Sequence, residues 1–286
     1  MKTGTKILLL LLLCSVIISG VSASGAQESA EAPGEAAAFR IVSLAPGITE
    51  TVFALGKGEN LVGRTDYCNF PLQAGNVQSV GPIQQPNIEM IISLKPDVVI
   101  ASTHAPKEAA DLLLNAGIEV KYFYAPQSFD GVYEVIRQVA SEIDADAEGV
   151  QLIQGIRARY AGMISQSDGQ RRPTVYYVVG FGEGGDWSAG GDTFIGAMIE
   201  TAGGDNIASE ISGWSFSLEK LVESDPDVII IGEGQKDSFI KTPVYSELTA
   251  VKNSRVYGIN EDIISRQGPR LIEGLEMLNR VFRSVE

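Results

Sequence analysis

The feature that most constrains the fold of this chain is an internal repeat. Residues 87–100 (NIEMIISLKPDVVI) and residues 217–230 (SLEKLVESDPDVII) align without a gap. In both, the apolar residues at the second, fifth and sixth places fit one buried helix face, the proline ends that helix, and the Pro-Asp-Val run leads into an apolar strand. Two such units in full register predict two lobes of like construction.

Short apolar strands and helices alternate along the rest of the chain. The composition, with 44% hydrophobic residues, is that of a globular protein. The length of 286 residues allows about two domains. The pattern predicts strands at 40–44, 98–101, 120–124 and 174–179, and helices at 49–55, 107–115 and 271–285. Strands separated by helices are typical of mainly parallel sheets. The predicted fold is therefore α/β, with two Rossmann-like lobes.

One long helix is expected to join the lobes. Apolar residues recur at helical spacing between Asp146 and Ser165, and we predict a connecting helix within residues 144–170. This leaves residues 39–143 for the N-terminal lobe and residues 171–286 for the C-terminal lobe. Ligands commonly bind in clefts between lobes.

The N-terminal segment has the pattern of an export signal. Two lysines precede an apolar run, and small residues follow it, so residues 1–23 are predicted to be a secretory signal peptide that directs the protein to the periplasm. Residues 24–38 contain no large apolar side chain and read as a flexible spacer. An alternative makes Cys14 the lipidated cysteine of a membrane-tethered lipoprotein. If residues 1–23 are cleaved, Cys68 is the one remaining cysteine and no intrachain disulfide forms.

Charge and histidine content exclude several classes of function. The formal net charge is −14, whereas binding to nucleic acid or to anionic lipid needs a basic face. His104 is the one histidine in the sequence, which excludes zinc sites built from several histidines. There is no G-x-S-x-G motif, which argues against a serine hydrolase. We expect a monomer that is not an enzyme, with no metal site or cofactor of its own.

A glycine-rich segment offers one enzymatic alternative. Residues 180–185 (GFGEGG) match G-x-G-x-x-G directly after a predicted strand. In an NAD-binding site the third glycine opens a helix that holds the pyrophosphate. Here Asp186, Trp187 and further glycines follow instead, so we do not expect dinucleotide binding.

Several segments together resemble the vitamin B12 and iron-complex substrate-binding proteins of ABC importers. They are residues 40–50 (RIVSLAPGITE), 87–89 (NIE), 95–100 (KPDVVI) and 202–207 (AGGDNI). The resemblance extends from Phe39 to the C-terminus. It implies a rigid helix between the lobes, and membrane permease subunits with a cytoplasmic ATPase as partners. It also implies a metal chelate as ligand, leaving open a cobalamin-like corrinoid, a ferric siderophore or haem. A tethered receptor without a transport role is the alternative.

The resemblance also implies a docking role for Glu89 and Glu219, which are the acids at the third place of the repeat. In cobalamin-binding relatives, one surface glutamate on each lobe pairs with arginines of the transporter. Arginine–carboxylate pairs give oriented contacts. The alternative is that both acids simply favour the first turn of a helix through its dipole.

For the ligand, the resemblance points to three aromatic residues and two basic ones. Tyr67, Trp187 and Trp214 match or lie near cleft aromatics, and flat rings suit a macrocycle; their alternative role is ordinary core packing. His104 is a candidate to ligate a metal or to bond a chelate, or is a solvated loop residue. Arg266 falls where relatives present a polar group to the ligand. Arg270 is expected to begin the last helix as a surface charge.

Overall fold

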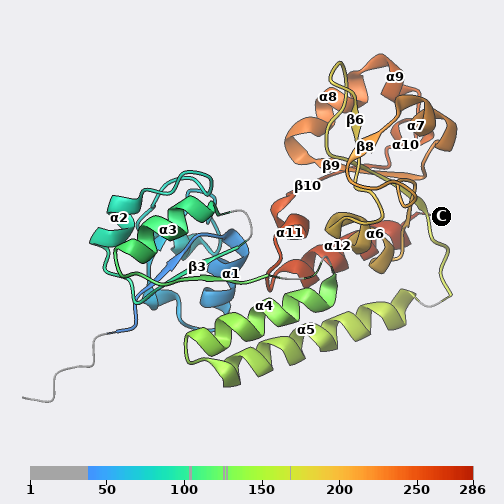
Figure 1. Ribbon diagram of the computed structural model, residues 1–286. Helices are drawn as coiled ribbons and strands as arrows, with labels where there is room; N and C mark the ends of the chain where they lie inside the picture. Colours follow the sequence, from blue (N-terminus) through green and yellow to red (C-terminus); the bar gives the residue numbers. More distant parts are fainter. Residues whose placement is uncertain (1–37, 103–104, 125, 127, 168, 286) are drawn as a thin grey trace, which may run out of the picture. The chain divides into compact units, whose positions relative to one another are not determined.

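The computed structural model describes residues 38–285 apart from 103–104, 125, 127 and 168 (Figure 1). The predicted signal peptide with Cys14, nearly all of the predicted spacer, and His104 lie outside the described residues. Within the described chain, the helices are too short or too polar to cross a lipid bilayer.

The N-terminal lobe is built on a four-stranded sheet in the order β2-β1-β3-β4, in which all neighbouring strands are parallel. This confirms the predicted parallel α/β layout. The strands are β1 (Ile41–Ser43), β2 (Leu61–Arg64), β3 (Val98–Ala101) and β4 (Val120–Tyr122). The helices of this lobe are α1 (Pro46–Ala54), α2 (Ile88–Ser93) and α3 (Lys107–Asn115), with 3-10 turns η1 (Gly58–Asn60) and η2 (Leu72–Asn76).

The C-terminal lobe repeats this sheet. Its strands are β5 (Thr174–Val178), β7 (Asp205–Asn206), β9 (Val228–Gly232) and β10 (Val256–Ile259), all parallel. Their order β7-β5-β9-β10 places the second strand at one edge, then the first, third and fourth, as in the N-terminal lobe. The two lobes therefore share strand order as well as sequence pattern.

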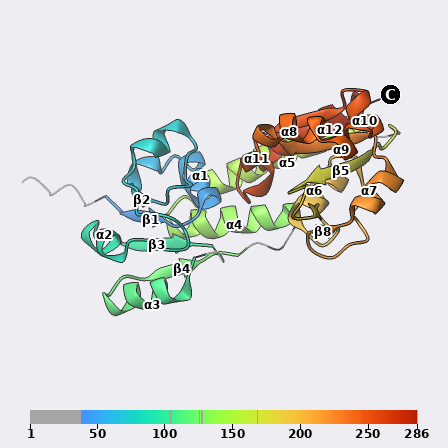
Figure 2. The same ribbon diagram turned by 90° about the horizontal axis from the view of Figure 1, so that it is seen from above.

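Further elements complete the C-terminal lobe. A small antiparallel pair, β6 (Asp186–Trp187) and β8 (Ser215–Phe216), is added to the repeated core. The helices are α6 (Phe194–Thr201), α7 (Leu218–Ser224), α8 (Lys236–Lys241), α9 (Pro243–Ser246), α10 (Thr249–Lys252), α11 (Asp262–Ser265) and α12 (Leu271–Arg283), with the 3-10 turn η3 (Glu233–Gln235). Figure 2 shows α12 lying along α5 (Asp146–Ser167), with which it is in contact.

The repeated segment folds in the same way in both lobes. Asn87 caps α2 and Ser217 caps α7, each accepting a hydrogen bond from the backbone N–H three residues on. Lys95 and Asp225, at equivalent places before the proline, both adopt positive φ, at 46° and 38°. Because non-glycine residues rarely adopt this conformation, its recurrence is independent evidence of the duplication.

The aspartate of each Pro-Asp-Val run ties two strands together. The Asp97 carboxylate accepts a hydrogen bond of 2.7 Å from the backbone N–H of Arg40, just before β1. The Asp227 carboxylate accepts one of 2.9 Å from the N–H of Thr174, at the start of β5. Each aspartate satisfies a backbone donor at the start of the neighbouring strand.

Two helices, rather than one, connect the sheets. The predicted connecting helix is observed as α5, and α4 (Phe129–Glu142) precedes it and packs beside it (Figure 1). Val135 and Val139 of α4 belong to the N-terminal core, whereas Val132 and Ile136 belong to the C-terminal core. One helix thus contributes its apolar side chains to both lobes.

The first helix starts earlier than the sequence pattern predicted. We expected it to open at Thr49, but α1 begins at Pro46. Proline fits the first turn of a helix because its missing N–H has no partner there and its fixed φ is already helical. The turn expected at residues 45–47 is therefore absorbed into the helix.

Replacing Asp227 by asparagine tests the strand tie. Burial by itself raises the pKa of the Asp227 carboxyl, but hydrogen bonds from Thr174 and Arg171 outweigh it and lower the pKa below its ordinary value. The ionised group therefore stabilises the fold above its unfolded pKa, near 4, and this contribution is lost as the pH falls through the lower folded value. We expect D227N to lower the free energy of unfolding by about 1–3 kcal/mol at pH 7.

Urea denaturation between pH 2.5 and pH 7 measures this effect. The difference from wild type should shrink below about pH 4. The exposed Asp237, which pairs loosely with Lys241 at 4.0 Å, supplies the control, and D237N should match wild type throughout. A pH-independent difference for D227N would contradict the assignment of the effect to the ionised carboxylate.

Candidate functional site

A cavity of about 730 Å³ is lined by residues of both lobes and is within the usual size range of small-molecule sites. Its N-terminal wall comprises residues 45–48, 83–84, 102 and 123–124, and its C-terminal wall comprises residues 192–195, 213–214 and 265–267. Val135 of α4 also lines the cavity. Residues 45–48, 102 and 123–124 come just after β1, β3 and β4, so this wall lies at the carboxyl ends of parallel strands, where such sheets commonly bind ligands.

The walls of the cavity are largely aromatic and aliphatic. Phe123, Tyr124, Phe194 and Trp214 contribute rings, and the rings of Tyr124 and Trp214 are exposed. Rigid rings provide a wide apolar contact area at a low cost in side-chain entropy. The cavity can therefore hold a large flat ligand.

The described cavity wall contains two charged side chains, and both already have partners. The Asp192 carboxylate accepts hydrogen bonds from the Ser212 hydroxyl at 2.5 Å and from the Gly213 N–H at 2.7 Å, and these bonds lower its pKa. Arg266 donates to three side chains, Glu50, Asn69 and Asp262, and to the Tyr67 carbonyl. No three His, Cys, Asp or Glu side chains of the described residues gather into a metal site.

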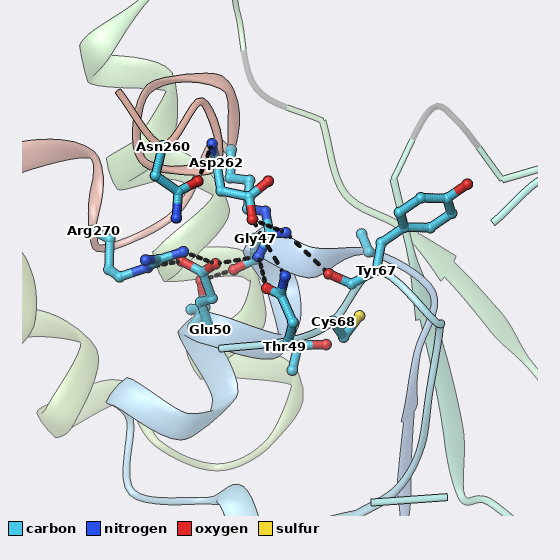
Figure 3. A network of polar contacts seen from close by, with 12 residues as sticks. Gly47, Thr49, Glu50, Tyr67, Cys68, Asn260, Asp262 and Arg270 are labelled. Atoms are coloured by element: carbon cyan, nitrogen blue, oxygen red, sulfur yellow. Dashed lines mark hydrogen bonds and ion pairs between the residues drawn. The ribbon is translucent and has the colours of Figure 1, made fainter. Parts of the chain in front are cut away.

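Glu50 of α1 is the centre of a buried ionic cluster between the lobes (Figure 3). Its side chain is 2% exposed, and its two partners Arg266 and Arg270 are 10% and 12% exposed. The Glu50 carboxylate accepts bonds of 3.0 Å from Arg266, and of 2.9 and 2.7 Å from the Nε and Nη2 atoms of Arg270. We call these three residues the Glu50 cluster.

The prediction that Arg270 is a surface charge is wrong. Its guanidinium pairs in bidentate fashion with Glu50 and stacks on the Phe70 ring, 3.7 Å from the ring centroid. Burial lowers the pKa of Arg270, but the bonds and charges of Glu50 and nearby acids raise it on balance. Arg270 does stand at the start of α12, as expected.

A close backbone approach accompanies the Glu50 cluster. A Cβ atom on Gly47 would lie 2.6 Å from the carbonyl oxygen of Gln267, and one on Gly268 would lie 3.1 Å from the carbonyl oxygen of Gly47. Gly47 and Gln267 both line the cavity. Glycine is thus required where α1 meets the segment that leads into α12.

The structure brings only part of the predicted ligand set to the cavity. Trp214 and Arg266 line it, whereas Tyr67 and Trp187 are exposed outside its lining. Trp187 pairs through its backbone with Ser215, next to Trp214. The Tyr67 carbonyl bonds Arg266, but its ring points away from Glu50 and Arg270 (Figure 3). The roles of these residues in ligand binding stay predictions.

Sequence reasoning missed Glu50, Phe123 and Tyr124. Glu50 ends the segment 40–50 that carries the family resemblance, and an acid among the apolar residues of a predicted helix was an available signal. The sequence pattern predicts that Tyr124 ends a strand, but β4 ends at Tyr122. The two aromatic residues that follow β4 are therefore at the strand end that faces the cavity.

The two candidate docking acids occupy equivalent places. Glu89 lies in the first turn of α2 and Glu219 in the first turn of α7, and both are exposed. Glu219 also accepts a hydrogen bond of 2.9 Å from the Ser217 hydroxyl. Backbone and Ser217 hydrogen bonds lower the pKa of Glu219, so it carries a full negative charge at neutral pH.

The glycine-rich segment 180–185 does not open a helix. It is followed by β6, and the Gly182 N–H donates a hydrogen bond of 3.0 Å to the Tyr245 hydroxyl. Without a helix N-terminus after the third glycine, the segment lacks the feature that holds a pyrophosphate. The structure thus agrees with the sequence in having no helix directly after these glycines, and the expectation that the chain binds no dinucleotide stays a prediction.

Two similar parallel sheets around a shared aromatic cavity define a two-lobed ligand-binding protein. Residues 41–263 match the model of a protein family described as "Periplasmic binding protein", and the chain belongs to this family. It is 34% identical to an uncharacterised ABC transporter substrate-binding lipoprotein of Bacillus subtilis, YvrC, over 84% of this chain and 78% of that protein. It is 31% identical to a cobalamin-binding protein of Halobacterium salinarum, over 86% of this chain and 69% of that protein.

Among solved structures, the chain is similar to the periplasmic haem-binding protein RhuT of Roseiflexus in its apo form. The TM-score is 0.80 at 28% sequence identity, and the match covers 87% of this chain and 99% of that one. The two-lobed α/β fold expected from the sequence is thereby confirmed.

Replacing Gly47 by alanine tests the close approach between the lobes. Because the added methyl group would meet backbone rather than a movable side chain, we expect Gly47→Ala to lower the free energy of unfolding by about 1–3 kcal/mol. Gly75 has nothing within 4 Å of a Cβ position, so Gly75→Ala is the matched control. Chemical denaturation measures both variants, and equal stability of the two would contradict the close approach.

Proposed function

We propose that this chain is the substrate-binding component of an ABC importer that captures a corrinoid of the cobalamin type. The observation that carries the proposal is the cavity itself, an aromatic cleft whose described walls offer no unpaired cation. Family membership and the names of the relatives, which are binding proteins rather than enzymes, support a binding role without catalysis.

The charge of the cavity favours a neutral macrocycle. Haem carries propionate carboxylates and many ferric siderophores are anionic, so burying either ligand without a cation is costly. Arg266 is the one basic side chain of the described lining, and Glu50 and Asp262 already neutralise it. A corrin ring presents amide groups at its edge instead, and these need neutral hydrogen-bonding partners.

Neutral polar groups are available in the cavity wall. Gln84, Ser102, Ser265 and Gln267 line it. Glutamine offers a carbonyl acceptor and two N–H donors, and serine offers a hydroxyl that both donates and accepts. This set matches the amide groups of a corrinoid better than it matches carboxylates.

Haem is the second candidate. Tyr124 is an exposed phenol in the cavity wall, and a tyrosine oxygen is a known ligand of ferric haem iron. His104 lies outside the described residues, so its part in either ligand set stays a prediction. Since haem still lacks a described cation for its propionates, we place the corrinoid first.

The same proposal covers the route of the protein and its partners. We infer that the N-terminal segment exports the chain to the periplasm or to the outer face of the membrane. Tethering through Cys14 is supported by the lipoprotein relative. Permease subunits with a cytoplasmic ATPase would receive the ligand, and Glu89 and Glu219 would each pair with arginines of these subunits.

Titration of the purified protein with cyanocobalamin and with haemin tests the choice of ligand. We expect a tight complex with cyanocobalamin and weaker binding of haemin, each followed by its visible absorbance. Trp214→Ala should weaken cyanocobalamin binding about tenfold or more, because an aromatic anchor of the cleft is lost.

Trp187, which is 43% exposed like Trp214 but outside the lining, is the matched control, and W187A should have the smaller effect. A protein that binds neither tetrapyrrole, or that prefers haemin, would refute the corrinoid assignment.

Charge reversal tests the docking acids. The double variant Glu89→Arg, Glu219→Arg should abolish ligand uptake by cells while ligand affinity stays unchanged, because neither acid belongs to the cavity lining. Glu108, an exposed acid in the first turn of α3, supplies the control, and E108R should transport normally. Normal uptake by the double variant would show that docking uses other residues.

A further inference from the structure

We propose that the Glu50 cluster is a positioning clamp that sets the separation of the two lobes before a ligand arrives, so that the ligand enters a preformed cavity. Glu50, Arg266 and Arg270 are positioning residues in this proposal. The proposal rests on the proposed function only for the choice of ligand in the second part of its test.

The charges of the Glu50 cluster are buried. The carboxylate of Glu50 is almost fully removed from solvent, and the cations that compensate it come from segments more than 200 residues along the chain. If the lobes moved apart, Glu50 would be left without a partner, and an uncompensated charge in a buried site is strongly unfavourable. Water would have to enter to replace the lost bonds. The cluster therefore resists opening.

The pair of Arg270 and Glu50 also fixes the orientation of the Arg270 guanidinium. Arg270 binds Glu50 with two parallel N–H···O bonds, which fix orientation as well as distance. Its guanidinium also lies against the Phe70 ring. A planar guanidinium held on an edge by a carboxylate and on a face by a ring has little freedom to turn.

The bonds of Arg266 extend beyond Glu50 to a second segment of the N-terminal lobe. Arg266 donates a bond of 2.8 Å to the Asn69 side chain and one of 3.0 Å to the Tyr67 carbonyl, in addition to Glu50. The cluster therefore holds two separate pieces of the N-terminal lobe, helix α1 and the loop 67–70. Figures 1 and 2 show α1 and α11 as neighbours, and Arg266 directly follows α11.

The Glu50 cluster borders the cavity. Arg266 and Gln267 line the cavity from one side and Gly47 lines it from the other. The contact between Gly47 and Gln267 prevents a closer approach, while the ionic bonds oppose separation. Together they define a narrow range for the width of the cavity at this edge.

Distance measurements between the lobes test the clamp in the ligand-free protein. Spin labels on Glu59→Cys and Lys241→Cys, in a Cys68→Ser background, report the distance between the lobes by double electron–electron resonance. We expect a narrow distribution for the otherwise wild-type chain and a distribution at least twice as broad for Glu50→Gln.

The matched control is Glu276→Gln. Glu276 also forms a bidentate pair with an arginine, Arg159, but this pair joins α5 to α12 rather than the two lobes. The E276Q distribution should stay as narrow as that of wild type. Equal widths for E50Q and wild type would overturn the proposal, and so would equal broadening in E276Q.

Ligand binding provides the second measurement. If the binding-competent separation falls to about one tenth of the population, the apparent affinity for cyanocobalamin falls about tenfold. Glu50→Asp, which keeps the carboxylate, should recover part of both the narrow distribution and the affinity. Broadening without a change in affinity would overturn the link to the cavity.

Arg270→Gln covers the case in which E50Q does not fold. This variant removes two of the bonds to Glu50 and leaves the Arg266 bond, so its distribution should be intermediate in width. An R270Q distribution as narrow as that of wild type would then overturn the proposal. If the protein binds no tetrapyrrole, the proposed function fails while the distance measurement on the ligand-free protein still decides the clamp.

Discussion

A buried carboxylate that needs two cations is the constraint on which the arrangement of this protein depends. Glu50 sits on the first helix, and its arginines come from the far end of the chain. Satisfying this one charge requires the first helix of one lobe and the start of the last helix of the other to meet. The ligand cavity borders that meeting point, since Gly47, Arg266 and Gln267 belong to its walls.

The duplicated half explains why a cavity exists between the sheets. Each lobe repeats the same strand order and the same aspartate tie at the entrance to its central strands. In the N-terminal lobe, the segments that follow β1, β3 and β4 line the cavity, as expected for the carboxyl ends of parallel strands. The candidate docking acids lie instead at the start of α2 and α7. The duplication thus supplies one shared site and one equivalent exposed acid on each lobe.

The sequence allowed the periodic features to be predicted and not the contacts between distant segments. The repeat at 87–100 and 217–230 predicted two similar lobes because its helix, proline and strand signals are local. The pairing of Glu50 with Arg270 joins residues 220 positions apart, and no local pattern reports such a pair. For the same reason the sequence alone predicts a surface charge at Arg270. It also gives no sign that Tyr124 lines the cavity, because that position depends on where β4 ends.

The sharing of helix α4 between two cores has a consequence for folding. Val135 and Val139 complete one apolar core and Val132 and Ile136 complete the other, all within two turns of a single helix. Neither core can lose this helix without exposing apolar surface in the other. The two halves are therefore coupled in folding, and a cut at their boundary would leave one half incomplete rather than release two independent domains.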